Sequence, residues 1–287
     1  MWRSGGLGWS GGSAGLRWWG GRVSPVVYGQ ALAFRAVGGR VCAGARGNAC
    51  PAGAAVPGRS TGGLCPACAR LDRAHSVAAD TFADDPRPYR VYLAWFGTGV
   101  VKVGITGEHR GDTRLREQGA VAFCWLGRGP LMAARRTEEV LRQALGVPDR
   151  VSYERKRALR VGLPGAGERA AEIEELYGRA LRVGGWGETL GVLPFTAHDH
   201  GGLFGLGALP PLDGSVTELV DGGVVTGRVR AAAGPDLHLL APDGRHLVLD
   251  GRLLGGWGLE RGGEDDAWSV PVGAAPESGG ERQEGLF

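Results

Sequence analysis

The stretch YRVYLAWFGTGVVKVGITGEHRGDTRLREQG, residues 89–119, carries the strongest structural signal in this chain. Its two apolar runs, 91–96 and 100–105, are rich in β-branched and aromatic residues and are separated by Gly-Thr-Gly. Such a pattern predicts a β-hairpin. Asp112 and Thr113 then precede Arg114, Leu115, Arg116 and Glu117, which indicates the start of a helix. The stretch therefore predicts a hairpin followed by a short arginine-bearing helix.

Periodic patterns on both sides of this stretch predict further elements. Downstream, the spacing of apolar residues predicts a strand over Val121–Leu126 and helices over Leu131–Leu145 and Glu168–Leu181. Alternating patterns predict short strands near both ends of the chain, at residues 15–18, 30–37, 224–229, 237–240 and 246–249. Pro242-Asp243-Gly244 is a turn signal between the last two. The class that follows is α+β, a small mixed sheet with flanking helices between two β-rich regions.

Changes in composition divide the chain into five expected segments. They are a β-rich segment at 1–40, a cysteine-bearing segment and linker at 41–88, an α/β core at 89–185, a β-meander region at 186–260, and an acidic tail at 261–287. The cysteine-bearing segment is rich in Gly and Pro and has too few apolar residues to pack alone. The tail is rich in Gly and Glu and is expected to be disordered.

The charge of the chain gives only a weak functional signal. The net charge is +3 over 287 residues, too small to indicate a polyanionic partner by itself. Arginines are concentrated between Arg128 and Arg160, which is compatible with a nucleic-acid contact and equally with a solvated helical face. No secretory signal and no run of membrane-spanning length is visible, so we expect a cytoplasmic protein without a membrane partner.

Four of the five cysteines have spacings typical of a metal site. Cys42, Cys50, Cys65 and Cys68 are separated by 7, 14 and 2 residues, and Cys65-Pro-Ala-Cys68 is a CxxC knuckle. Four thiolates complete a closed tetrahedral shell, so the pattern predicts a structural zinc ion. A redox-active CxxC and incidental thiols are the alternatives. Cys124 lies in an apolar run and is expected to be a small buried hydrophobe.

A second possible metal site is the segment His198-Asp199-His200. No third ligand stands at a suitable spacing, so this interpretation is weaker than the cysteine site.

The hairpin and its helix resemble the GIY-YIG nuclease superfamily, in which tyrosine-bearing strands precede an arginine-bearing helix. Arg90-Val91-Tyr92 matches the first motif and Lys102-Val103-Gly104 the second. The family's helical arginine matches Arg114, with Arg110 as second choice, and its metal-binding glutamate matches Glu138 or the neighbouring Glu139. The resemblance implies hydrolysis of a phosphodiester, with Mg²⁺ on the glutamate and a tyrosine hydroxyl of lowered pKa helping to activate water.

Two departures from the family motifs weaken the expectation of activity. Lys102 replaces the tyrosine of the second motif, and Arg90 replaces the leading glycine of the first. The chain also resembles an uncharacterised prokaryotic family that combines a β segment, a four-cysteine cluster, a VYLA…VKVGIT core and a C-terminal meander, from about Leu16 to Leu259. That family brings no activity with it, so the resemblance implies architecture rather than function.

These observations lead to a zinc-stabilised nucleic-acid-binding protein with a core that is degenerate in catalysis. Its nucleic-acid contacts are expected at Arg110, Arg135, Arg136 and Arg142. A Mg²⁺-dependent endonuclease is the first alternative, and its catalytic residues would be Tyr92, Lys102, Arg114 and Glu138. The second alternative is a protein-interaction scaffold whose basic stretch binds an acidic partner.

Overall fold

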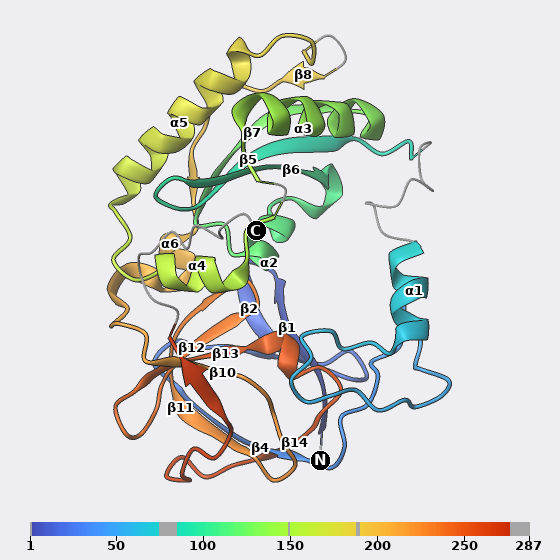
Figure 1. Ribbon diagram of the computed structural model, residues 1–287, viewed down its shortest axis with the longest axis vertical. Coiled ribbons are helices and arrows are strands. Elements are labelled where there is room, and N and C mark those ends of the chain that lie inside the picture. The colour runs from blue at the N-terminus through green and yellow to red at the C-terminus, as the bar shows by residue number, and fades with distance from the viewer. Residues whose placement is uncertain (1, 75–84, 149, 188–189, 276–287) are drawn as a thin grey trace, which may run out of the picture.

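The computed structural model describes residues 2–74, 85–148, 150–187 and 190–275, which form two β-sheets and several short helices (Figure 1). This arrangement confirms the expected α+β class. In Figure 1 the smaller sheet lies between α3 and α5 above and α2 and α4 below, and the larger sheet lies beneath α4. No helix in the described part of the chain is both long enough and apolar enough to cross a membrane.

The elements have the following bounds. The larger sheet contains, in spatial order, β15 (Val272–Ala274), β10 (Gly214–Val216), β13 (His246–Asp250), β12 (Asp236–Leu240), β11 (Val224–Ala233), β4 (Ala31–Val37), β14 (Gly258–Arg261), β1 (Trp2–Ser10), β2 (Ser13–Trp18) and β3 (Val23–Pro25). The smaller sheet contains β6 (Val100–Gly107), β5 (Tyr89–Gly97), β7 (Ala122–Gly129) and β8 (Gly191–Val192), with β9 (His198–Asp199) also paired to β7. The helices are α1 (Pro66–Ala74), α2 (Thr113–Gln118), α3 (Leu131–Leu145), α4 (Tyr153–Leu159), α5 (Ala166–Arg182) and α6 (Gly201–Phe204), and the 3₁₀ turns are η2 (Glu108–Arg110), η3 (Leu206–Ala208) and η4 (Gly251–Leu253).

The larger sheet joins the two ends of the chain. Strand β4 pairs antiparallel with β11 on one side, where Phe34 is opposite Val225. On its other side β4 pairs with β14, where Ala36 is opposite Leu259, and β14 in turn pairs with β1. The N-terminal and C-terminal β regions, which the sequence analysis treats as separate segments, therefore contribute alternating strands to one sheet. The period of an alternating pattern indicates a strand but does not identify its partner.

Strand β1 is an element that the sequence analysis missed, because glycines interrupt its apolar pattern. Two of these glycines allow close approach of other groups. A Cβ atom on Gly8 would lie 2.1 Å from Nε of Arg17, whose side chain crosses the strand at that point. Gly6 has φ +86° and faces the carbonyl oxygen of Gly251, 3.1 Å from where a Cβ would be. A side chain at Gly6 would be strained by the backbone conformation, and one at Gly8 would displace the Arg17 side chain.

Strand β5 is buried on both faces, which explains its unbroken apolar sequence. Val91, Leu93 and Trp95 belong to the core cluster that also contains side chains of α3 and α5. Tyr92 and Phe96 belong to a second cluster with Leu115 of α2, on the opposite face. The alternation follows from the period of two along a strand. The smaller sheet is thus covered on one face by α3 and α5 and on the other by α2 and α4.

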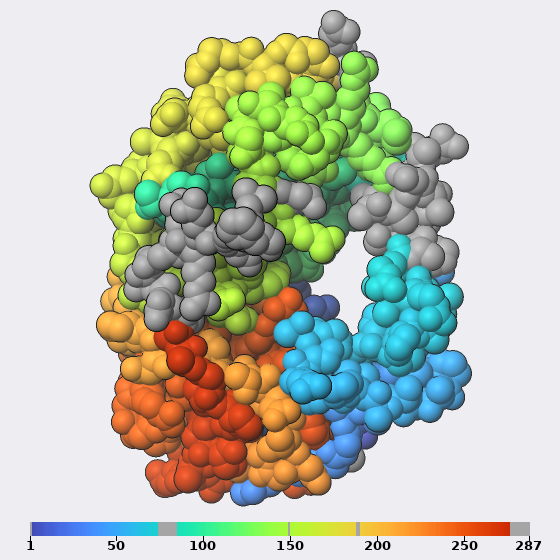
Figure 2. Space-filling model, in the orientation of Figure 1, coloured from blue at the N-terminus to red at the C-terminus, as the bar shows by residue number. Residues whose placement is uncertain are grey.

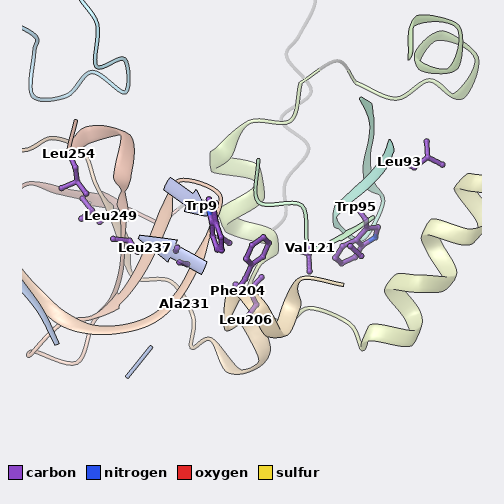
Figure 3. Close-up of a cluster of buried hydrophobic side chains, with 14 of the residues drawn as sticks. Trp9, Leu93, Trp95, Val121, Phe204, Leu206, Ala231, Leu237, Leu249 and Leu254 are labelled. Carbon is purple, nitrogen blue, oxygen red and sulfur yellow. The ribbon is translucent and has the colours of Figure 1, made fainter. Parts of the chain in front are cut away.

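The two sheets share one hydrophobic core (Figure 3). Figure 3 shows Trp9 of β1 beside Phe204 of α6, at the boundary between the two sheets, and the ring centroids are 5.0 Å apart. Trp9 also donates a hydrogen bond from Nε1 to the carbonyl oxygen of Gly234, at 2.8 Å. Gly234 in turn touches Gly119 at the end of α2, where a Cβ on either glycine would lie about 3 Å from the other's backbone nitrogen. The contact at this boundary therefore requires glycine on both sides.

A buried ion-pair network connects α4 to the larger sheet. Arg160, the C-cap residue of α4, and Arg157 within α4 both pair with Asp236, whose side chain is fully buried, at N–O distances of 2.6 and 2.5 Å. Arg157 also reaches Asp250 at 2.7 Å, and Arg252 pairs with the same carboxylate at 2.6 Å. Asp250 is the last residue of β13 and Asp236 the first of β12, so one helix is held to two adjacent strands.

Several boundaries differ from the sequence-based expectation. The helix over Leu131–Leu145 is confirmed residue for residue, and the predicted helix at Glu168–Leu181 begins two residues earlier, at Ala166. Part of the tail that was expected to be disordered is a strand, because Val272–Ala274 pairs with β10. The remainder of that tail, from residue 276, lies outside the described residues.

Candidate functional site

The four predicted cysteine ligands meet in one place. Their Sγ atoms all lie within 4.8 Å of one another, and those of Cys50 and Cys65 are 3.9 Å apart. A tetrahedral ion with Zn–S bonds of about 2.3 Å needs S–S distances of about 3.8 Å. The donor set and its spacing therefore fit a metal ion. Apart from these cysteines, no group of three or more His, Cys, Asp or Glu side chains in the described residues is arranged to hold one.

Backbone N–H groups point at the sulfur of Cys42. The amides of Cys65 and Gly44 donate to Sγ of Cys42 at 3.1 and 3.4 Å. Gly44 has φ +79°, and a Cβ there would lie 1.8 Å from the carbonyl oxygen of Asn48, so only glycine fits this turn.

The thiols do not ionise alike. A backbone hydrogen bond from Ala54 is the main cause that lowers the pKa of Cys50 to about 6, and the backbone of Cys68 lowers the pKa of Cys65. Burial and the neighbouring sulfurs instead raise the pKa of Cys68 to about 12. Cys50 and Cys65 thus ionise more readily than Cys68, and their sulfurs oppose ionisation of Cys68. A bound cation would offset this repulsion.

The cysteine segment is attached to the larger sheet through a buried arginine. In Figure 2 the segment projects from the body of the molecule at the lower right. Arg40, at its base, is 2% exposed and donates only to backbone carbonyls. Its acceptors are Pro57 and Ser60 of the segment and Arg252 and Gly255 of the sheet. Burial lowers the pKa of Arg40.

Tyr92, the predicted catalytic tyrosine, is buried rather than open to solvent. It is 2% exposed, and its hydroxyl accepts a hydrogen bond from Nε2 of Gln118 at 2.8 Å. Its ring lies over Gly104, where a Cβ would be 2.3 Å from the hydroxyl oxygen, so this position of the second motif requires glycine. Burial raises the pKa of Tyr92 to about 12. To activate water, the hydroxyl of Tyr92 would need a lowered pKa and not a raised one.

Other predicted residues surround this tyrosine from different elements. Arg114 of α2 and Arg110 of η2 act to lower the pKa of Tyr92, whereas Glu138 of α3 acts to raise it. These groups are brought within electrostatic range of one hydroxyl although they are up to 46 residues apart along the chain. Lys102 lies on β6, and its charge acts on Lys156 in the same region.

The arginines predicted to contact nucleic acid lie on η2 and α3, and two of them are engaged in ion pairs. Arg110 pairs with Glu117 at 2.9 Å, and the same carboxylate lies 3.8 Å from Arg114. Arg142 pairs with Glu139 at 2.6 Å, three residues earlier on α3. Arg136 is exposed and Arg135 is half-buried on the same helix.

Lys156 of α4 is a residue at this site that the sequence analysis missed. It is 4% exposed, its Nζ donates to the carbonyl oxygen of Gln118 at 2.9 Å, and it lies 4.1 Å from the centre of the Phe96 ring. Burial is the main cause that lowers its pKa to about 7. Gln118 thus connects Lys156 to the hydroxyl of Tyr92. The one available signal was the rarity of lysine, which otherwise occurs only as Lys102.

The segment 198–200 does not form a second metal site. His198 stacks on Phe123 with ring centroids 4.7 Å apart, and Asp199 pairs with Arg169 at 2.7 Å. His200 is buried, and its ring bonds to the carbonyl oxygen of Ala120 and to Asp112. His198 and His200 both contact the ring of Phe123, because alternate residues of an extended segment lie on one side, whereas Asp199 pairs with Arg169.

Comparison with known families places the chain. The profile of the family described as "Protein of unknown function (DUF2797)" matches residues 29–259, so the chain belongs to this family. No curated protein and no solved structure matches this chain.

Proposed function

We propose that this chain is a nucleic-acid-binding protein with a GIY-YIG-like core, and that its four cysteines hold a structural zinc ion. The observation that carries the proposal is that α2, which bears Arg114, packs through Leu115 on the cluster that contains Tyr92. The charges of Arg110 and Arg114 accordingly act to lower the pKa of that tyrosine. The core also has the order that the resemblance implies, in which a tyrosine-bearing hairpin precedes an arginine-bearing helix, a third strand and a glutamate-bearing helix. Arginines in such a setting bind phosphates through charge-assisted hydrogen bonds.

The state of Tyr92 favours binding over cleavage. Its hydroxyl is buried, hydrogen-bonded to Gln118, and of raised pKa, so it is neutral at physiological pH. A neutral, inaccessible phenol is poorly suited to activate water. Lys102 stands where the resemblance implies a second tyrosine, and a lysine offers positive charge for a phosphate rather than a base.

A Mg²⁺-dependent nuclease is the second candidate. It is favoured by Glu138, whose charge acts to raise the pKa of Tyr92, in the opposite direction to the two arginines. A carboxylate in that position could hold Mg²⁺, which would neutralise charge on a bound phosphate.

Zinc is the ion that best suits the cysteine site. Four thiolates are soft donors, and a closed shell without a position for substrate is typical of structural zinc. Elemental analysis of purified protein by mass spectrometry should give about one zinc per chain. Iron in equal amount would identify a different metal in the same site.

The functional proposal is tested by binding and cleavage assays on the full chain. Labelled single-stranded DNA, duplex DNA and RNA are titrated with the protein, and binding is followed by fluorescence anisotropy. Arg114→Ala should weaken binding about threefold to tenfold, as expected for loss of one or more phosphate contacts. Arg182→Ala is the matched control, since it removes an equally charged, exposed side chain from α5 on the other face of the sheet.

The same samples distinguish the candidates. Binding without cleavage in Mg²⁺ or Mn²⁺ supports the proposal. Cleavage that is lost in Glu138→Ala, with folding and zinc content intact, supports the nuclease instead. Absence of binding to every nucleic acid contradicts both and leaves the protein-interaction scaffold.

A further inference from the structure

A cluster of tryptophans and arginines lies at one end of the β1–β2 hairpin and is distinct from the region around Tyr92. Trp2 is 51% exposed and Trp19 is 39% exposed, although tryptophan is usually well buried. The adjoining strand β3 ends the larger sheet and is only three residues long. We refer to Trp2, Arg3, Arg17, Trp18, Trp19 and Arg22 as the Trp-Arg edge.

Within the Trp-Arg edge, a guanidinium group lies over each of the two exposed indole rings. The Cζ of Arg22 lies 4.6 Å from the Trp2 ring centroid, and Trp2 contacts Trp18 edge to face at 6.3 Å. The Cζ of Arg3 lies 5.4 Å from the ring of Trp19. The amide of Trp19 donates to the carbonyl oxygen of Arg3 at 2.9 Å, so the two pairs are joined at the same end of the hairpin. The edge is therefore an ordered surface and not a set of isolated side chains.

Within the described residues, the arginines of this edge have no carboxylate partner, although Arg3 donates to the backbone carbonyl oxygen of Gly256 and Arg17 to that of Leu7. The chain has no Asp or Glu before Asp72, whereas it has eight arginines in that stretch. Among residues 2–74, 85–148, 150–187 and 190–275, none of Arg3, Arg17 and Arg22 forms an ion pair. Arg35 of β4 differs, since it lies 3.7 Å from Asp266. Elsewhere, Arg110, Arg142 and Arg157 all have carboxylate partners.

We propose that the Trp-Arg edge binds single-stranded nucleic acid, with exposed indoles stacking on bases and the arginines contacting phosphates. Stacking platforms next to unpaired cations are what sequence-tolerant binders of single strands use. An acidic peptide would satisfy the arginines but leave the indoles without planar partners. A lipid surface with anionic headgroups would also accept indoles beside arginines, so vesicles are included in the test as the competing ligand. In a duplex the bases are stacked on each other, so this edge should prefer a single strand.

The test compares full-length protein with matched variants, by anisotropy with a labelled oligothymidine of about 20 nucleotides and with a duplex of the same length. Replacing Trp2 and Trp19 by Ala should weaken binding to the single strand by roughly fivefold to hundredfold per indole, with a smaller effect on the duplex. Trp19→Phe should keep most of the affinity, because phenylalanine also stacks. Met132→Ala is the control, since Met132 is equally exposed on α3.

Salt dependence tests the role of the arginines. Arg22→Ala should reduce the slope of log affinity against log salt by about 0.7 for a single strand. Arg182→Ala should leave this slope unchanged. Far-ultraviolet circular dichroism and zinc content establish that each variant is folded.

The outcomes separate this proposal from the one for the core. Loss of single-strand binding in the tryptophan variant but not in Arg114→Ala supports the Trp-Arg edge and contradicts a core binding surface. The reverse pattern overturns the Trp-Arg edge while the core proposal stands. Equal or tighter binding to polyglutamate, or to vesicles containing phosphatidylserine, also overturns it.

Discussion

The cysteine segment and the α/β core are attached to the same large sheet, but they are stabilised in different ways. The cysteine segment has a cluster of very few apolar side chains around its thiols, such as Ala45 and Val56. The core instead buries whole strands, with Leu93 and Trp95 fully inaccessible. Apolar burial stabilises by about 25 cal/mol per Å², so the small segment gains little from it. We therefore expect its order to depend on backbone contacts and on the metal ion that we propose for the four cysteines.

The buried arginines of the two regions differ in the same way. Arg40, beneath the cysteine segment, is surrounded only by carbonyl oxygens, whereas Arg160, beneath the core, faces the carboxylate of Asp236. Carbonyl groups satisfy the donors of a guanidinium without neutralising its charge. A carboxylate does both, but it becomes a buried charge itself when its partner is removed. At the base of the cysteine segment, the buried arginine is therefore stabilised by hydrogen bonds to carbonyl groups. Beneath the core, the buried arginine is stabilised by an ion pair as well as by hydrogen bonding.

The largest effect is expected from removing the metal. Structural zinc contributes about 10–16 kcal/mol of apparent binding free energy in small domains, which here would be folding free energy of the cysteine segment. Cys65→Ser, or a strong chelator, should abolish metal binding and expose residues 41–68 to hydrogen exchange, while the core stays protected. Hydrogen exchange followed by mass spectrometry measures both regions in one experiment.

Cys124→Ser provides the control for this prediction. Cys124 is fully buried in the core and is not part of the cysteine cluster, so the metal content should be unchanged. If the cysteine segment keeps its protection after complete loss of metal, the contrast between the two regions is wrong.

The next largest effect is expected at the contact between α4 and the sheet. Asp236→Ala would leave Arg160 buried without its carboxylate, and breaking such a pair costs about 3–5 kcal/mol. Urea unfolding should show this loss with no change in metal content. Asp243→Ala, which breaks an exposed pair with Arg245, should change stability by less than about 1 kcal/mol. Equal effects of the two substitutions would show that burial of the network contributes nothing.

The smallest effect concerns Lys156. Its pKa is about 7 in the folded protein, below the ordinary value of 10.5, because burial disfavours the charged form. Between those values the unfolded chain binds more protons, so stability should rise as pH increases from about 7 to 10.5. Below pH 7 the full destabilisation is present. Arg160, Lys102 and Arg114 lower this pKa further, and Asp236 partly opposes them.

Lys156→Met should remove this pH dependence and increase the free energy of unfolding at pH 7 by about 2 kcal/mol, after loss of the bond to Gln118. Urea titrations at pH 6, 7.5 and 9 measure the slope. A variant with the same slope as the parent would exclude Lys156 as its source.

Much of the local structure was predictable because its signals act over a few residues. The hairpin at 89–107 follows from two apolar runs around a glycine turn, and α3 follows from apolar spacing over Leu131–Leu145. Strand β1 was missed because its glycines serve contacts with Arg17 and Gly251 that no local pattern shows. Helix α4 was missed because its charged sequence is explained by carboxylates about 80–90 residues further along.

The sequence by itself determined the cluster of four cysteines and the order of strands and helices in the core, since CxxC spacing and hydrophobic period depend on neighbouring residues. Only the tertiary structure decided which side chains are buried, paired or exposed. Tyr92 becomes a buried, neutral phenol because α2 brings Gln118 over it, and Arg160 becomes a paired charge because β12 lies beneath α4. Trp2 and Trp19 remain exposed because β3 ends the sheet beside them. Burial, pairing and exposure depend on which distant segments meet, and that is a property of the whole fold.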